Sequence, residues 1–273
     1  MKRFLSIDYD YFIDASAEER SSLFPDGGNE NLPATIRDYI WDSHYSDSRL
    51  KEIGVIKEFK DIKKMCRDLY CQAMITDSHK HLFDFIMQNT FEDEEFEVYN
   101  IDFHHDLYDY RTGSERVNCG NWATILREER PNMTFLWVKR DDSDVAALGI
   151  ETVTEFPKVE IITFEELQSR YGGGAFITNF FDFLFLCRSA MWSPPHLDKH
   201  FVKLVKTILD HCPAQYENGI DKPRKFDSEP SYFVGVDLAS GSDTTVIMNG
   251  RSPNERIVKR TGSKSSESTK GDS

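Results

Sequence analysis

The sequence has no apolar run that approaches the roughly 18 residues needed to cross a bilayer, which argues against a membrane-spanning protein. It has only five cysteines, an odd number, and no C-x-x-C pair among them. The N-terminus runs directly into a strand pattern, without the apolar core of a signal peptide. Together these absences favour a reducing, cytoplasmic location.

Positive charge is also scarce. The chain has 33 basic and 47 acidic residues and a formal net charge of −14, with no local basic patch. Nonspecific binding to nucleic acid or to an anionic membrane is therefore not expected. The length of 273 residues, with 39% hydrophobic and 13% aromatic residues, suffices for one large α/β core.

Strand-like and helix-like patterns alternate along the chain. Apolar runs predict strands within 4–12, 98–106, 134–138, 159–164 and 180–187. Helical spacing predicts two helices within 50–89, joined at a polar junction at 76–79, and further helices at 121–129 and 198–211. We expect loops over 20–49. Alternating strands and helices predict an α/β fold, with a mainly parallel sheet between two helical layers.

The composition changes toward the C-terminus. Residues 232–237 form a strand-like island, whereas 251–273 contain almost no apolar residues and are expected to be disordered. We therefore predict a catalytic domain over 1–250 and a disordered tail. The segment 235–245 faintly resembles the first strand of an RNase H-like nuclease of phage packaging motors. Too few residues follow it to complete such a domain, so we interpret it as a hairpin or a terminal sheet strand.

Potential metal ligands gather at the ends of two predicted strands. Asp102, His104 and Asp106 occupy alternate positions, which project to one side of an extended segment, and Asp8 and Asp10 repeat this spacing. Sites in open parallel sheets collect at the carboxyl ends of strands. Carboxylates mixed with imidazoles, without a thiolate, favour Mn²⁺ or another first-row divalent ion.

These residues resemble a known family. Residues 101–107 (IDFHHDL) are similar to the D-x-H-x-D-L element of the ureohydrolase superfamily of arginases and agmatinases. The resemblance is closer to the UPF0489 proteins, a branch that includes peptide arginases. Further segments similar to this branch, within roughly residues 4–195, are 5–12 (LSIDYDYF), 77–79 (DSH), 120–122 (GNW), 186–189 (LCRS) and 192–195 (WSPP).

The resemblance implies an arginase/deacetylase-like three-layer α/β/α fold with a binuclear manganese site. The implied ligands are Asp8, Asp10, His79, Asp102, His104 and Asp106. Asp102 and Asp8 would bridge the ions. His79 and Asp106 would complete one side, and His104 and Asp10 the other. A metal-bound hydroxide, with no side-chain base assigned, would attack a guanidinium or amide carbon.

One departure concerns chain order. In the wider superfamily the D-x-D strand follows the D-x-H-x-D strand, whereas Asp8 and Asp10 precede it here by more than ninety residues. A circular permutation would explain the difference. Asp237 stands in the usual order but lacks a second carboxylate at the alternate position, so we favour Asp8 and Asp10 as ligands.

The resemblance implies that the protein hydrolyses arginine in a peptide or protein to ornithine and urea, or acts on a small guanidino compound. Asn121, Trp122 and Arg188 are candidate substrate-binding residues. Trp122 would equally suit a helix core, and Arg188 a structural ion pair. Two alternatives stay open: a zinc-type amide deacetylase, and a metal-stabilised interaction module without turnover.

Overall fold

The computed structural model describes residues 1–26, 32–109, 116–143, 157–171 and 180–224, and the backbone of two strands at 232–236 and 245–249. The chain divides into two compact units, Met1–Phe226 and Asp227–Ser273. This division lies before the domain boundary expected at residue 250. The expected tail at 251–273 and the alternative ligand Asp237 lie outside the described residues.

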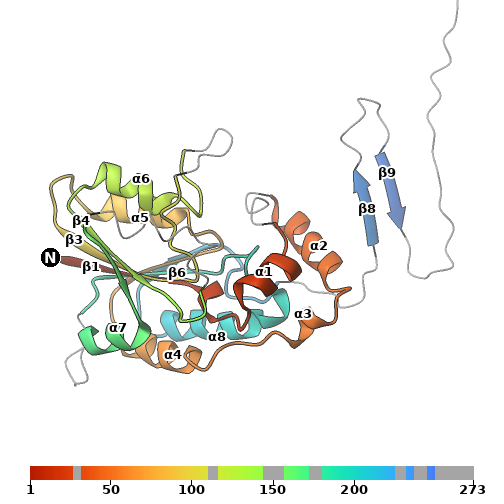
Figure 1. Ribbon diagram of the computed structural model, residues 1–273, viewed down its shortest axis with the longest axis horizontal. Coiled ribbons are helices and arrows are strands. Elements are labelled where there is room, and N and C mark those ends of the chain that lie inside the picture. Colours follow the sequence, from red (N-terminus) through yellow and green to blue (C-terminus); the bar gives the residue numbers. More distant parts are fainter. Residues whose placement is uncertain are drawn as a thin grey trace, which may run out of the picture. The chain divides into compact units, whose positions relative to one another are not determined.

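The first unit contains one seven-stranded sheet in which every pair of neighbours is parallel (Figure 1). The order is β5-β4-β3-β1-β6-β2-β7. The strands are β1 (Lys2–Asp8), β2 (Gln72–Thr76), β3 (Phe96–Ile101), β4 (Met133–Val138), β5 (Val159–Ile162), β6 (Phe183–Cys187) and β7 (Ala214–Tyr216). The predicted α/β fold with a parallel sheet is confirmed.

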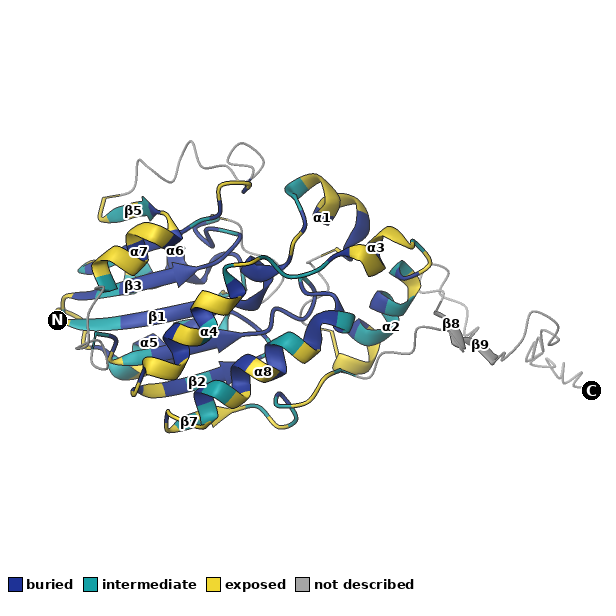
Figure 2. Ribbon diagram, turned by 90° about the horizontal axis from the view of Figure 1, so that it is seen from below, coloured by how far each residue is buried: buried dark blue, intermediate teal, exposed yellow. Residues whose placement is uncertain are grey.

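Helices cover both faces of the sheet (Figure 1). One face packs against α4 (Phe59–Asp68), α7 (Phe164–Tyr171) and α8 (Asp198–Leu209), and the other against α5 (His81–Asn89) and α6 (Trp122–Glu129). Side chains alternate between these two cores along β1, because Leu5 and Ile7 join the first and Phe4 joins the second. In Figure 2, β1 is buried over most of its length, whereas α4 and α8 show both buried and exposed residues.

The segment expected as loops contains helices. These are α2 (Ala34–His44) and the end of α1 (Ala17–Leu23), whereas α3 (Arg49–Glu52) lies almost wholly within 50–89, where helices were expected. The capping box of Ser16 and Glu19 starts α1, as the sequence indicates. The prediction of a loop was wrong for α2, whose buried residues are only Arg37 and Trp41. So small an apolar face leaves little helical periodicity in the sequence.

Strand β2 was also missed. We expected two helices joined at a polar junction within 50–89, but β2 separates α4 from α5. Its residues 72–76 (QAMIT) form a short run with both faces covered by helices, and periodicity cannot distinguish such a strand from a helix. His79 therefore follows the carboxyl end of a strand.

The two ligand-bearing strands are shorter than expected. Strand β1 ends at Asp8, and a 3-10 helix follows at Tyr9–Phe12. The side chain of Asp8 caps this helix by accepting a hydrogen bond from the backbone N–H of Asp10. Strand β3 ends at Ile101, so Asp102, His104 and Asp106 lie on the loop beyond it. Asp106 has a φ of 55°.

In the second unit, β8 (Tyr232–Val236) and β9 (Thr245–Asn249) pair antiparallel as a hairpin. This agrees with the hairpin interpretation of the sequence. Among the helices of the described residues, none combines the length and apolar character that a membrane span requires.

Candidate metal centre

The sheet order brings the two acidic strand ends together. Strand β1 lies between β3 and β6, and the chain passes from β1 to β2 on one side of it and then to β3 on the other, which makes the carboxyl ends of β1 and β3 a topological switch point. Ile7 is level with Ile101 in the parallel register, so Asp8 and Asp102 leave the sheet side by side. The adjacency of the two strands that a permuted chain order requires is therefore present.

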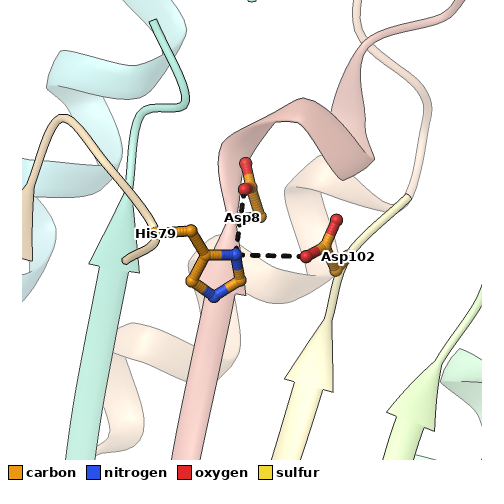
Figure 3. A group of neighbouring side chains, drawn as sticks. All are labelled: Asp8, His79 and Asp102. Atoms are coloured by element: carbon orange, nitrogen blue, oxygen red, sulfur yellow. Dashed lines mark ion pairs between the residues drawn. The ribbon is translucent and has the colours of Figure 1, made fainter. Parts of the chain in front are cut away.

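His79 is surrounded by carboxylates (Figure 3). Its Nδ1 lies 3.2 Å from Oδ2 of Asp8, 3.2 Å from Oδ2 of Asp102 and 2.9 Å from Oδ2 of Asp106. The side chains of Asp8, His79 and Asp102 each offer one atom within 4.8 Å of the others. This group can hold a metal ion.

A second group lies around His104. Its Nδ1 is 3.1 Å from Oδ2 of Asp10 and 3.9 Å from Oδ1 of Asp102. Asp10, Asp102 and His104 likewise offer ligand atoms within 4.8 Å of one another. Asp102 belongs to both groups and directs one carboxylate oxygen to each. The six side chains singled out from the sequence thus lie together, arranged as two groups with a shared carboxylate.

Burial sets the protonation of this cluster. Desolvation, together with the charges of neighbouring carboxylates, raises the pKa of Asp8 and that of Asp102 to about 7. Burial lowers the pKa of His79, but the surrounding carboxylates outweigh it and raise that pKa well above its ordinary value. Without a metal, a proton on His79 serves as the cation among the three carboxylates.

The pKa of Asp10 moves the other way. Burial raises it, but the interaction with His104 and the charge of Arg20 together lower it below its ordinary value. The Arg20 guanidinium lies 3.3 Å from Oδ2 of Asp10 and also donates to the Asp10 backbone carbonyl at 2.7 Å. Asp10 is therefore held ionised at neutral pH.

Two buried atoms of the cluster have no hydrogen-bond partner, namely Oδ1 of Asp10 and Nδ1 of His79. The three carboxylate oxygens near Nδ1 are close enough for an ion pair, but none has hydrogen-bond geometry. Buried polar atoms are normally satisfied. A carboxylate oxygen and an imidazole nitrogen without hydrogen-bond partners are the kinds of ligand atom that bind a divalent cation. The residues of the cluster therefore fit a metal ion.

Neighbouring side chains orient the candidate ligands. The Ser6 hydroxyl lies 2.8 Å from Nε2 of His79, which leaves Nδ1 facing the carboxylates. The His79 ring stacks on Phe185, with ring centroids 5.7 Å apart, and packs against Trp122. Trp122 also donates its indole N–H to Oδ2 of Asp106 at 2.5 Å. The ring of His105 packs on Trp137 and on Tyr108.

A cavity of about 240 Å³ opens onto the cluster. Four ligand candidates line it, and the other described residues of its walls are uncharged. These are Tyr108, Cys119, Gly120, Ser189 and Trp192. A larger open cleft of about 570 Å³ lies at the carboxyl ends of β4 and β5, and none of the six ligand candidates is among its described lining residues. Of these two, the smaller cavity is the one that opens onto the candidate ligands.

The candidate substrate-binding residues do not appear among the described residues that line this cavity. Asn121 bonds within its own loop, to the backbone of Asn118 and Arg116. Trp122 is buried and bonds to Asp106. Arg188 pairs with Asp77 at 2.6 Å and with Asp198 at 3.3 Å. The ion pair and the packed tryptophan correspond to the structural alternatives considered for Arg188 and Trp122.

Sequence reasoning assigned no role to four residues beside the cluster. Ser6 lies inside β1, and Tyr108 lies on the loop after β3. Ser189 and Trp192 belong to the segments 186–189 and 192–195 that were noted for their resemblance, but a lone serine or tryptophan has no spacing that marks it as part of a site.

Comparisons of the chain with protein-family models, with curated proteins and with solved structures give no match.

Proposed function

We propose that this protein is a binuclear-metal hydrolase of C–N bonds that acts on the guanidino group of arginine in a peptide or protein. The observation that carries the proposal is the position of Asp102. Its Oδ2 faces His79 and its Oδ1 faces His104, so one carboxylate serves two groups of potential ligands. Sharing of this kind suits two ions held a few ångströms apart.

Charge balance supports bound cations. Asp8, Asp10, Asp102 and Asp106 are all buried, and among the described residues Arg20 pairs only with Asp10, so the ionised cluster needs further positive charge, which divalent cations would supply. Carboxylate and imidazole ligands without a thiolate favour Mn²⁺. When bound, such ions lower the pKa of a water molecule and so supply a nucleophile at neutral pH.

The residues of the chain would then position the substrate and exclude water. Trp192 packs against His104 with ring centroids 4.8 Å apart, and Tyr108 lines the same cavity. Their aromatic faces suit a planar guanidinium cation. Together they can direct the guanidinium carbon toward the candidate metal ligands, four of which line the same cavity.

The uncharged walls favour arginine within a peptide over free arginine. Among the described residues, the cavity offers no lysine or arginine for an α-carboxylate and no acidic residue apart from the ligand candidates. A free amino acid would leave its charged ends unpaired there, at a large desolvation cost. A peptide backbone has no such charges.

All five cysteines are free thiols, which suits the reducing, cytoplasmic location that we propose for the reaction.

The test is incubation with Mn²⁺ and each of arginine, agmatine and arginine-containing peptides, with urea assayed and ornithine sought by mass spectrometry. We expect urea from the peptides, and much less from free arginine. Asp102→Asn, which is nearly isosteric, should release none. If no urea forms from any of these compounds, the guanidino hydrolysis is wrong.

An amide deacetylase is the second candidate. Asp8, His79 and Asp102 alone provide the two carboxylates and one imidazole that suffice for a single zinc ion. The group around His104 would then have no ligand role. One bound zinc per chain, with acetate released from an acetyl-lysine peptide, would favour the deacetylase.

A metal-stabilised interaction module would bind the metal and gain a higher melting temperature without any turnover.

A further inference from the structure

The loop after β6 presents a strained serine to the metal-ligand candidates. Ser189 has a φ of 49°, a left-handed conformation that is uncommon for residues other than glycine. The residue is 2% exposed. Its hydroxyl donates a hydrogen bond to Oδ2 of Asp8, the oxygen that lies 3.2 Å from Nδ1 of His79. The two residues are separated by 181 positions in the sequence.

Several contacts impose this conformation on the loop. Arg224 donates to the carbonyls of Ala190 and Ser193 at 2.5 and 2.6 Å, and the Trp41 indole donates to the same Ala190 carbonyl at 2.7 Å. The Ser193 hydroxyl donates to the carbonyl of Ser189 at 3.1 Å. A strained residue persists only where its surroundings determine it in this way, and such residues cluster at functional sites.

With Ser189 in place, both oxygens of Asp8 are oriented. Oδ1 accepts the backbone N–H of Asp10 at 3.0 Å, and Oδ2 accepts the Ser189 hydroxyl. A carboxylate has about four acceptor sites, so lone pairs are left for metal ions. We infer that Ser189 is a positioning residue that holds the Asp8 carboxylate in its metal-binding orientation. The inference rests on the metal centre of the proposed function.

The experiment measures Mn²⁺ affinity by competition with a chromophoric chelator, with no substrate present. Ser189→Ala and Ser189→Gly both remove the hydroxyl, but glycine adopts the left-handed conformation without strain. We expect both variants to bind Mn²⁺ about 10 to 100 times more weakly than the wild type, the usual effect of losing a residue that orients a ligand. Ser189→Gly carries the test if Ser189→Ala does not fold.

Ser193→Ala is the matched control, because its hydroxyl braces the same loop by bonding to the carbonyls of Arg188 and Ser189 and not to Asp8. It should lower the melting temperature and weaken Mn²⁺ binding much less than Ser189→Gly does, because the hydroxyl that bonds to Asp8 remains. The inference is overturned if Ser189→Gly binds Mn²⁺ as the wild type does, or if Ser193→Ala weakens binding equally. Failure of the wild type to bind Mn²⁺ would instead contradict the proposed function itself.

Discussion

Trp122 and Asp106 are joined by a hydrogen bond of 2.5 Å between the indole N–H and Oδ2. The same oxygen lies 2.9 Å from Nδ1 of His79. Trp122 is fully buried at the start of α6, where it also packs on the His79 ring. A residue of the hydrophobic core thus fixes one candidate ligand by a hydrogen bond and another by ring contact.

Replacing Trp122 with phenylalanine should weaken both stability and metal binding. The variant leaves a cavity and removes the donor to Asp106, so we expect the free energy of unfolding to fall by about 2 to 4 kcal/mol. Denaturant unfolding and Mn²⁺ titration measure the two effects. Trp137→Phe is the control, since the Trp137 indole donates to the backbone carbonyl of Asp102 and to no carboxylate. Equal Mn²⁺ affinities in Trp122→Phe and the wild type would contradict the prediction.

The stability of the metal-free protein should fall as the pH rises. The folded-state pKa values of Asp8 and Asp102 are raised to about 7, and that of His79 is raised well above 6.5. A folded-state pKa above the unfolded value stabilises the protein at low pH, and that contribution is lost as the pH rises through the folded-state pKa. For the two carboxylates the loss is spread between pH 3.8 and about 7, and for His79 it comes later.

Bound metal should remove this dependence, because it balances the ionised carboxylates. The melting temperature measured with and without a chelator, from about pH 5 to about pH 8, should therefore show a chelator effect that grows with pH. Asp8→Asn should reduce that growth. A chelator effect of the same size at every pH would show that these groups do not bind the metal.

Cys71 and Cys212 should form a disulfide under mild oxidation. Ala73 of β2 pairs with Ala214 of β7, and its backbone N–H donates to the carbonyl of Pro213 at 2.9 Å. Cys71 and Cys212 each stand two positions before this pair, so the parallel register places them opposite each other. Interaction with the Cys71 thiol lowers the pKa of Cys212 to about 6. Both thiols are nearly buried, so a small oxidant is required.

With hydrogen peroxide, the Cys212 thiolate would become a sulfenic acid, and the Cys71 thiol would displace water from it to close the disulfide. We expect a mass loss of about 2 Da and stabilisation by up to about 4 kcal/mol, because the bond closes a long loop. Mass spectrometry and thermal melting measure these changes. Cys71→Ser should show neither, and an oxidised wild type that retains two free thiols at these positions would refute the pairing.

Five of the six candidate ligands were recognisable from the sequence because they stand at alternate positions, whereas His79 has no such spacing and was included through the family resemblance. Asp102, His104 and Asp106 alternate directly after an apolar run, and strand ends are where an open parallel sheet places its sites. The fold could also be predicted from a local pattern, because most strands are continuous apolar runs. Strand β2 and helix α2 were missed because a short strand of five residues, three of them buried, and a helix with two buried residues carry no distinct period.

The residues that orient the ligands could not be predicted. Ser6 reaches His79 across 73 positions, and Ser189 reaches Asp8 across 181. Such contacts depend on strand order and on the path of a loop, and neither is encoded in local periodicity. The 3-10 turn that carries Asp10 depends likewise on one capping hydrogen bond, which the backbone N–H of Asp10 donates to the Asp8 side chain.

The central claim is that Asp102 joins two metal sites, and a metal count tests it most directly. Protein loaded with Mn²⁺, freed of excess metal and analysed by elemental analysis should contain two ions per chain. Asp102→Asn, which affects both groups, should lose both ions, whereas Asp106→Asn should retain the ion on the His104 side. A single ion in the wild type, or two ions retained in Asp102→Asn, would contradict the account.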